Sequence, residues 1–160
     1  MARIIAVANQ KGGVGKTTSV VNIGAIFAEK GNRVLLVDLD PPAALTAPYG
    51  ANPFDIRRSV YHLLLAQELD ASSIIRRQLR PSLDLLPANV DLAGAEIELI
   101  DQMGREYLLQ EALASLGGDY DFILIDCGPS LGMLTVNALT AADEVLIPSG
   151  GLGRLVVKWW

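Results

Sequence analysis

The sequence predicts an α/β fold in which a mainly parallel β-sheet lies between two layers of helices. Short apolar runs without alternating polar residues recur along the chain, as is typical of strands buried on both faces of a parallel sheet. Segments of helical length separate most of these runs, and right-handed crossovers are expected to connect the strands. A chain of 160 residues with 51% hydrophobic content is long enough for one domain with a sizeable core. The predicted strands are residues 3–8, 34–37, 83–87, 122–126 and 145–148.

The first predicted strand leads directly into a glycine-rich segment, residues 9–18. A largely apolar helix follows from Thr17 to Lys30, and Gly31 is expected to end it because glycine is favoured just after a helix. The second strand ends in Asp38-Leu39-Asp40-Pro41-Pro42, where the prolines prevent further ladder pairing. Two carboxylates are therefore expected at the carboxyl end of a strand, which is where open α/β sheets bind ligands.

The middle of the chain is less regular. Residues 43–58 are expected to form a loop and residues 60–66 a short helix, while residues 72–78 fit no single structure. After the third strand, Asp91 is expected to cap one long helix that runs to about Leu116 and is closed by two glycines. Its apolar stripe consists of Leu92, Ala95, Leu99, Met103 and Tyr107.

The last part of the chain repeats the design of the second strand, because the strand at 122–126 also ends in a carboxylate, that of Asp126. A helix is expected over 131–142. Residues 149–160 show no clear period, and the tryptophan pair at the end is expected to be disordered or wrongly buried. We therefore expect one domain over residues 1–148 and a divergent tail over residues 149–160.

Composition excludes several classes of protein. A net charge of −5 disfavours nucleic-acid binding through bulk charge, and the one arginine cluster is explained equally well by a solvated surface. A single cysteine, Cys127, excludes an internal disulfide framework and fits a reducing cytoplasm. The chain shows neither a secretory signal nor an apolar run long enough to span a membrane. The clustered arginines are Arg57, Arg58, Arg76, Arg77 and Arg80.

The glycine-rich segment is a phosphate loop with two departures from the standard pattern. Gly15, Lys16 and Thr17 match its second half, but Gln10 replaces the first glycine and Lys11 adds a second cation. Lys16 is expected to reach the β- and γ-phosphates and Thr17 to bind Mg²⁺, while Thr18 would touch a phosphate nearer the base. The alternative is a glycine turn without a ligand. Because one loop does not need two lysines, Lys11 is expected to act outside its own subunit. The expected nucleotide contacts are Lys11, Gly12, Gly13, Val14, Gly15, Lys16, Thr17 and Thr18.

Three aspartates complete the candidate site. Asp126 suits an acidic group that holds a magnesium-bound water, and the alternative is a capping or turn residue. Asp38 and Asp40 lie two residues apart and would share one side of the strand, so Asp40 could orient an attacking water and Asp38 could join the metal shell. Either one could instead cap a neighbouring helix.

The segment Lys-Gly-Gly-Val-Gly-Lys-Thr-Thr resembles the deviant phosphate loop of the ParA/MinD ATPases, with Lys11 at the family's signature lysine. Gln10 is similar to the chromosome and plasmid partition branch. The resemblance extends from about residue 3 to residue 148 and implies a P-loop NTPase fold that lacks the family's C-terminal strands. Further matching segments are Val37-Asp38-Leu39-Asp40-Pro41, residues 86–89, residues 92–96 and residues 120–130.

The resemblance implies a cytoplasmic, nucleoid-associated ATPase of chromosome or plasmid segregation. It implies that ATP and Mg²⁺ are the cofactors and that the ATP-bound protein is a homodimer in which Lys11 crosses to the partner's phosphates. Lys16, Asp40 and Lys11 would act in hydrolysis, and Thr17 and Asp126 around the metal. The family's partners are a ParB-like activator and non-specific DNA, with no membrane.

Some residues depart from the family pattern. Pro42 stands where the family usually has glutamine, and Gly128 replaces a usual proline. The chain also ends where family members continue with further strands, an adenine-reading loop and the basic residues used for DNA, so we expect a truncated or frame-shifted product. The second hypothesis is therefore a nucleotide-binding or interaction fragment without turnover. One cysteine disfavours an iron–sulfur ATPase, and residues 156–160 are too short for a membrane-binding helix.

Overall fold

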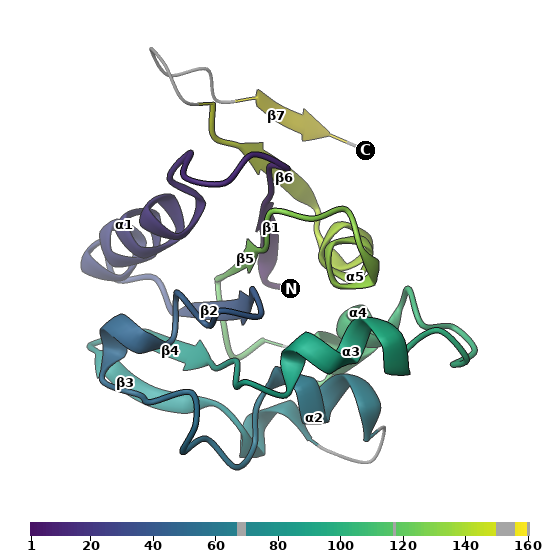
Figure 1. The fold of residues 1–160 in the computed structure, drawn as a ribbon. Helices are drawn as coiled ribbons and strands as arrows, with labels where there is room; N and C mark the ends of the chain where they lie inside the picture. The colour runs from purple at the N-terminus through teal and green to yellow at the C-terminus, as the bar shows by residue number, and fades with distance from the viewer. Residues whose placement is uncertain (67–69, 117, 150–155, 160) are drawn as a thin grey trace.

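A seven-stranded sheet lies at the centre of the described chain, with strand order β3-β4-β2-β5-β1-β6-β7 (Figure 1). The structure is a computed structural model that describes residues 1–66, 70–116, 118–149 and, for the backbone alone, 156–159. The strands are β1 Arg3–Val7, β2 Val34–Leu39, β3 Arg76–Arg80, β4 Leu83–Leu86, β5 Phe122–Cys127, β6 Glu144–Ile147 and β7 Val156–Trp159. The α-helices are α1 Lys16–Glu29, α2 Val60–Leu65, α3 Leu92–Glu98, α4 Leu108–Ala114 and α5 Met133–Ala141.

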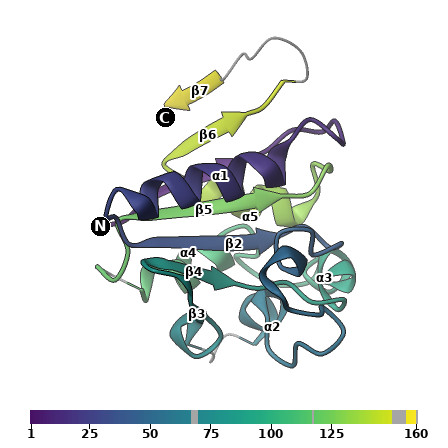
Figure 2. The same cartoon turned by 90° about the vertical axis from the view of Figure 1, so that its left-hand side faces the viewer.

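The five central strands are parallel, and only the two edge strands, β3 and β7, are antiparallel to their neighbours. Helix α1 covers one face of the sheet, and α4 and α5 cover the other (Figure 1). The predicted three-layer α/β fold is confirmed. Because the central strands are parallel, the loops that follow β1, β2 and β5 gather at one end of the sheet, and the N-terminus lies at the other (Figure 2).

The core is divided by the sheet into two clusters, and β2 contributes to both. Leu35 and Val37 pack with the helices on the α5 side, whereas Val34 and Leu36 pack with the α1 side. All six residues of β2 are buried, which explains why its sequence has no polar alternation. Helix α1 approaches β2 closely, because a Cβ built on Gly24 would lie 2.7 Å from Leu36 Cδ2.

The predicted long helix over 91–116 is wrong. Helix α3 ends at Glu98 and α4 begins only at Leu108, and between them Gly104 has a φ of 68°, which reverses the chain. The predicted apolar stripe is interrupted where the helix is. Leu99 remains buried, but Met103 and Tyr107 are exposed. Asp91 makes no side-chain cap on α3, and its carboxylate instead accepts a hydrogen bond from Asn89 Nδ2 at 2.7 Å.

Two strands were not predicted. The ambiguous segment contains a 3₁₀ turn, Ala71–Ser73, followed by the edge strand β3. Within the last residues, Val156–Trp159 forms β7, which pairs antiparallel with β6, so the described part of the tail belongs to the sheet. The expected disorder is therefore wrong for Val156–Trp159, whereas the burial of Trp159 and all of Trp160 lie outside what the structure describes. Gly117, expected to help close the long helix, also lies outside them.

Candidate functional site

The phosphate loop connects the carboxyl end of β1 to the N-terminus of α1. Gly13 and Gly15 adopt φ angles of 71° and 88°, a region that side-chain-bearing residues rarely enter, so glycine is required for this backbone path. Gly15 is the N-cap residue of α1 and supplies no side-chain cap. The first N–H groups of the helix are therefore available to a ligand, and the helix dipole favours an anion there.

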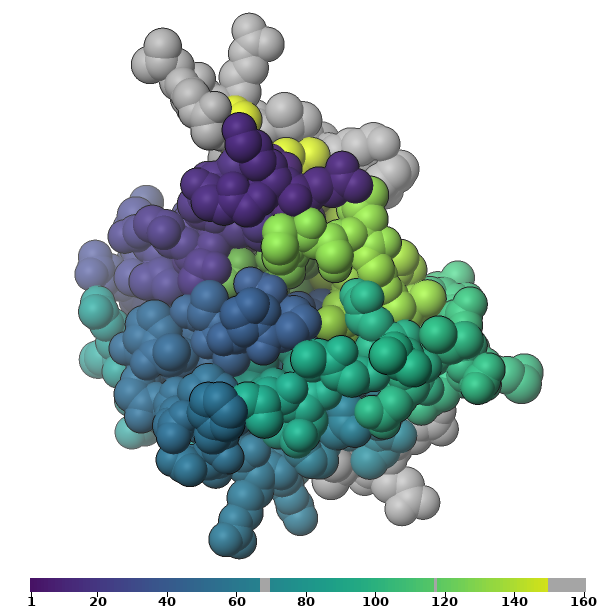
Figure 3. Space-filling model, in the orientation of Figure 1, coloured from purple at the N-terminus to yellow at the C-terminus, as the bar shows by residue number. Residues whose placement is uncertain are grey.

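A cavity of about 390 Å³ opens beside this loop. The loops after β1, β2 and β5 border it, and they surround one hollow region of the front face (Figure 3). Its lining combines backbone donors, one ammonium group, two hydroxyl groups and one carboxylate, which together suit a phosphate ligand and a cation. The lining residues are Gly12, Gly13, Gly15, Lys16, Thr17, Thr18, Asp40, Pro42 and Pro129.

The two lysines occupy different environments. Lys16 is only 8% exposed, and its Nζ donates to the Lys11 backbone oxygen at 3.4 Å. The Lys11 side chain is exposed, and among the described residues it does not contribute to the cavity lining. Its backbone N–H donates to Asn9 Oδ1 at 2.9 Å, which fixes the turn while the ammonium group remains in solvent. Lys16 is thus the cavity's own cation. Val14 is half-buried in the loop but likewise does not line the cavity.

Asp126 lies on β5, beside Val7 of β1 and Asp38 of β2. It is completely buried, and no hydrogen bond of normal geometry from the described residues reaches either carboxylate oxygen. Burial raises its pKa to about 7, and the nearby Thr17 hydroxyl partly opposes this rise. An unpartnered buried carboxylate next to a threonine hydroxyl fits a magnesium site, because oxygen ligands and a nearby cation would remove the desolvation cost.

Asp40 follows β2 and borders the cavity. Its Oδ1 is buried without a hydrogen-bond partner among the described residues, and burial raises its pKa while Lys16 opposes the rise. Gly128 permits this position, since a Cβ built there would lie 2.8 Å from Asp40 Oδ1. The Asp40 carbonyl accepts from Ala43 N at 2.7 Å, which closes a tight turn around the two prolines. Asp40 can therefore face a ligand in the cavity without a competing internal bond.

Asp38 differs from the other two aspartates because its oxygens are already occupied. Oδ2 accepts from Thr46 Oγ1 at 2.6 Å and from Thr46 N at 2.8 Å, while Oδ1 accepts from Asp40 N at 3.2 Å. Burial nevertheless raises its pKa to about 6. These contacts give Asp38 a structural part, in which it anchors the loop that carries Asp40. Its membership of a metal shell stays a prediction.

Thr46 is a residue of the site that the sequence analysis missed. Besides its bonds to Asp38, its Oγ1 accepts from Ala88 N at 3.1 Å and so joins the loop after β2 to the loop after β4. Ala43, in the same loop, has a φ of 54°, which is strained for a residue with a side chain. Threonine and alanine within a proline-rich loop give no sequence signal for either feature.

Two further residues with reactive side chains, Cys127 and His62, do not line this cavity. Cys127 is buried, and burial raises the pKa of its thiol, as expected of a packed residue. The His62 ring accepts from Ser59 N at 3.3 Å in a capping box of α2. The described residues contain no cluster of three or more His, Cys, Asp or Glu side chains arranged for a metal. In the same part of the chain, no helix has the length and apolar content needed to cross a membrane.

Two named relatives are similar to this chain over most of its length. The Bacillus subtilis sporulation initiation inhibitor protein Soj is 51% identical over 148 residues, which cover 92% of this chain and 58% of Soj. The chromosome partitioning protein ParA of Myxococcus xanthus is 47% identical over 148 residues, covering 92% of this chain and 52% of that protein. The chain therefore spans a little more than half the length of these relatives.

Solved structures agree with the fold. A Mycobacterium smegmatis protein named as cobyrinic acid a,c-diamide synthase, with a bound ATP analogue and magnesium, aligns with a TM-score of 0.89 and 52% identity over 93% of this chain and 60% of that one. A Borrelia burgdorferi plasmid partition protein bound to AMPPNP aligns with a TM-score of 0.80 and 34% identity, over 92% of this chain and 62% of that one. A family model described as an AAA domain matches residues 2–151. The chain belongs to the ParA/MinD-type family of P-loop ATP-binding proteins.

Proposed function

We propose that this chain binds MgATP, dimerises when ATP is bound, and hydrolyses ATP to ADP and phosphate in chromosome or plasmid segregation. One observation carries the proposal: a glycine-lined cavity holds a buried lysine, and beside it two buried aspartates, Asp40 and Asp126, have carboxylate oxygens without partners. Such oxygens are costly unless a ligand satisfies them. The names of Soj and ParA, and the nucleotides in similar structures, support the assignment of that ligand to ATP.

Within one subunit, the backbone of the loop and the N-terminus of α1 would hold the phosphates. Lys16 would neutralise the β- and γ-phosphates from its buried position, and Thr18 would contact a phosphate nearer the base. Thr17 would bind Mg²⁺ through its hydroxyl, and Asp126 would accept a hydrogen bond from a water on the metal. When bound, Mg²⁺ offsets the negative charge that shifts between the phosphates during transfer.

Lys11 would act across the dimer interface. Its ammonium group is exposed, while Lys16 already supplies the cation of its own cavity. A second subunit facing the same surface would bring its nucleotide towards this free lysine, and the charge of the triphosphate would favour the contact. The position of Lys11 outside the cavity lining supports this division of roles.

Asp40 would orient the attacking water, because its unpartnered Oδ1 borders the cavity. Pro42 is the feature that opposes turnover. It also lines the cavity, yet it has neither a side-chain amide nor a backbone N–H that could contact water or phosphate. Pro42 therefore favours a second candidate function, that of a nucleotide-binding or interaction fragment that does not hydrolyse ATP.

The partners follow from the family and remain part of the proposal. They are a second copy of the chain when ATP is bound, a ParB-like activator protein, and non-specific DNA. The proposed location is the cytoplasm in association with the nucleoid, without membrane attachment.

Sedimentation with and without MgATP, run beside phosphate release, tests this function. The proposal predicts a monomer that becomes a dimer with MgATP and releases phosphate slowly. Asp40→Ala should give a dimer that persists with ATP, because the bound nucleotide is no longer hydrolysed, and unchanged turnover would remove Asp40 from the mechanism. A chain that binds ATP but neither dimerises nor releases phosphate would select the fragment. Absence of ATP binding would contradict both candidates.

A further inference from the structure

Asn9 lies where β1 has ended and the phosphate loop begins, and its side chain forms hydrogen bonds in two directions. Its Nδ2 donates to the Pro148 backbone oxygen at 2.7 Å, and its Oδ1 accepts from Lys11 N at 2.9 Å. The first bond spans 139 residues of sequence and reaches the end of β6, whereas the second stays within the loop. One half-buried amide group therefore joins β6 to the residue that carries the second lysine of the loop.

The bond to Pro148 continues the pairing of β1 with β6. These strands are parallel, with Val7 opposite Leu146, and Ala8 N donates to the Leu146 oxygen at 3.1 Å (Figure 1). In a parallel ladder the next acceptor lies two residues further along, which is the Pro148 oxygen. The Asn9 side chain supplies a donor to this oxygen at the point where the chain turns into the loop. The start of the phosphate loop is thus fixed to the sheet.

The bond to Lys11 closes an Asx turn, in which an asparagine side-chain oxygen accepts from the N–H two residues further on. The Lys11 backbone oxygen is also engaged, because Lys16 Nζ donates to it at 3.4 Å. The peptide groups on both sides of the Lys11 Cα are therefore held. Their orientation determines the direction in which the Lys11 side chain leaves the loop, although the side chain itself is exposed.

Asn9 does not belong to the lining of the phosphate cavity in the part of the chain that the structure describes. It borders a separate groove of about 320 Å³, whose other lining residues are mostly apolar, such as Leu131, Leu139 and Val145. Apolar surroundings strengthen a hydrogen bond such as that between Asn9 and Pro148. Because Asn9 lies outside the cavity lining, it can influence a bound nucleotide only through the residues that it holds.

From these contacts we propose that Asn9 is a positioning residue for Lys11, and that it holds the turn from which the Lys11 ammonium group reaches the nucleotide of a second subunit. A lysine that crosses an interface loses conformational freedom when the subunits associate, and a backbone that is already fixed reduces this loss. Removal of the turn should weaken dimerisation without weakening nucleotide binding by one subunit. This inference rests on the proposed function, because that function assigns Lys11 to the second subunit.

The test uses the whole 160-residue chain with Mg²⁺ and AMPPNP, an ATP analogue that is not hydrolysed. In sedimentation, Asn9→Ala should weaken dimerisation at least tenfold, while the affinity of the monomer for AMPPNP should stay within twofold of the parent. Asn9→Ser should dimerise within threefold of the parent, because a serine hydroxyl can accept from the N–H two residues on.

The matched control is Asn32→Ala. It also removes a bond from a half-buried asparagine amide to a backbone oxygen, that of Phe27 at 3.0 Å, but at the opposite end of α1. Its dimerisation should equal that of the parent. Thermal unfolding monitored by circular dichroism shows that each variant is folded. If Asn9→Ala does not fold, Asn9→Ser decides: dimerisation within threefold of the parent supports the turn, and a tenfold loss overturns it.

Two further measurements separate positioning of Lys11 from general damage to the loop. Contact between an ammonium group and a triphosphate is screened by salt, so dimerisation of the parent should weaken as sodium chloride is added. This dependence should be smaller in Asn9→Ala, which keeps the charge of Lys11, and unchanged in Asn32→Ala. In the nucleotide-free chain, amide hydrogen exchange at Lys11 should be at least threefold faster in Asn9→Ala than in the parent.

The positioning role is overturned if Asn9→Ala dimerises as the parent does, if Asn9→Ser is as weak as Asn9→Ala, or if salt dependence or exchange at Lys11 is unchanged. A tenfold loss of AMPPNP affinity in the Asn9→Ala monomer would place Asn9 in the nucleotide site and would also overturn it. A parent that does not dimerise, or a Lys11→Ala variant that dimerises equally well, refutes the proposed function together with the positioning role. An unchanged Asn9→Ala beside a monomeric Lys11→Ala overturns the positioning role alone.

Discussion

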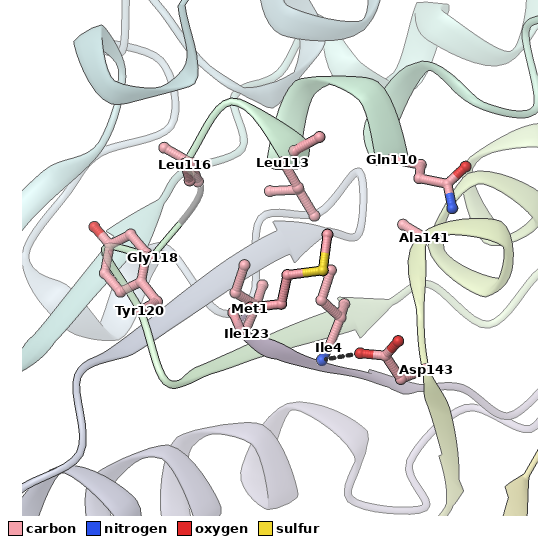
Figure 4. A pocket seen from close by; sticks show the side chains of 12 residues that line it. Met1, Ile4, Gln110, Leu113, Leu116, Gly118, Tyr120, Ile123, Ala141 and Asp143 are labelled. Atoms are coloured by element: carbon pink, nitrogen blue, oxygen red, sulfur yellow. Dashed lines mark hydrogen bonds between the residues drawn. The ribbon is translucent and has the colours of Figure 1, made fainter.

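The two ends of the parallel sheet each hold a cavity, and the two cavities are similar in volume but opposite in chemistry. The cavity at the carboxyl end, about 390 Å³, is lined by the phosphate loop, Lys16 and Asp40. The cavity at the amino end, about 330 Å³, is lined mainly by aliphatic side chains such as Leu113 and Ile123 (Figure 4). Volume alone does not distinguish a binding site from a packing gap between helices and sheet.

The difference lies in whether polar groups are satisfied. At the amino end, Ile4 N donates to Asp143 Oδ2 at 2.8 Å, and Tyr120 donates its hydroxyl to Asp84 Oδ2 at 2.8 Å. At the carboxyl end, both oxygens of Asp126 and Oδ1 of Asp40 are buried without partners among the described residues. The first end has completed its hydrogen bonds within the protein, whereas the second requires a ligand to complete them.

The largest change in stability is expected from a substitution at the amino end of the sheet. Leu113→Ala removes a buried side chain from that cavity's wall and should lower the free energy of unfolding by about 2–5 kcal/mol. Nucleotide affinity should be unchanged under conditions where the variant is folded, because the substitution lies at the opposite end of the sheet. Urea denaturation and an ATP titration measure the two quantities. A loss of nucleotide affinity would mean that the two ends are coupled.

A smaller change in the free energy of unfolding, of opposite sign, is expected from a substitution at the carboxyl end. The folded protein keeps Asp126 protonated up to about pH 7, whereas an unperturbed carboxyl loses its proton near pH 3.8. The stability of the metal-free protein should therefore fall as pH rises from about 4 to about 7. Asp126→Asn lacks this ionisation and should be more stable than the parent at about pH 8, by roughly 1–3 kcal/mol.

The pH series contains its own control. The raised pKa of Asp38 acts in the same direction in both proteins, so the difference between them reports the ionisation of Asp126 together with its coupling to Asp38. The stability advantage should shrink as pH falls towards about 4 and disappear below that pH, where the carboxyl is protonated in the unfolded state as well as in the folded one. The variant should also lose the dependence of nucleotide affinity on Mg²⁺. A constant advantage across the series would show that ionisation of Asp126 is not its cause.

The smallest effect concerns the loop that holds Asp40. Ala43 has a φ of 54°, so Ala43→Gly should relieve backbone strain. Part of this gain is lost because glycine has more conformational freedom than alanine in the unfolded chain, so the free energy of unfolding should rise by roughly 0.5 kcal/mol. Thermal unfolding against the parent detects the change. Destabilisation by the same substitution would indicate that the Ala43 methyl group contributes more through packing than the strain costs.

The fold was predictable where local sequence and tertiary packing agree. Strands such as β2 are buried on both faces, so their apolar runs identified them, and Gly31 marked the end of α1 as expected. The prediction of one long helix failed because the apolar period continues past Gly104, whereas the chain reverses at this glycine and Asn137 holds the turn. The strand β7 gave no period because it is a short edge strand defined by pairing with β6.

The candidate site was predictable for a similar reason. The glycines, Lys16 and the three aspartates lie at the carboxyl ends of strands or just after them, so the parallel topology brings them together. Sequence could not separate the aspartates, because only the structure shows that Asp38 is bonded to Thr46 while Asp126 is not. The role of Thr46 depends on a contact with Ala88, which is 42 residues away.

On the proposed division of roles, the cavity of one chain binds its nucleotide through Lys16, whereas Lys11 serves a second subunit. Titration of a fluorescent ATP analogue, with Mg²⁺ and at a protein concentration that keeps the chain monomeric, tests it most directly. Lys16→Ala should weaken binding at least thirtyfold, a loss of about 2–5 kcal/mol for a buried charge partner, and Lys11→Ala should bind as the parent does. Equal loss of affinity in the two variants would contradict this division of roles between Lys16 and Lys11.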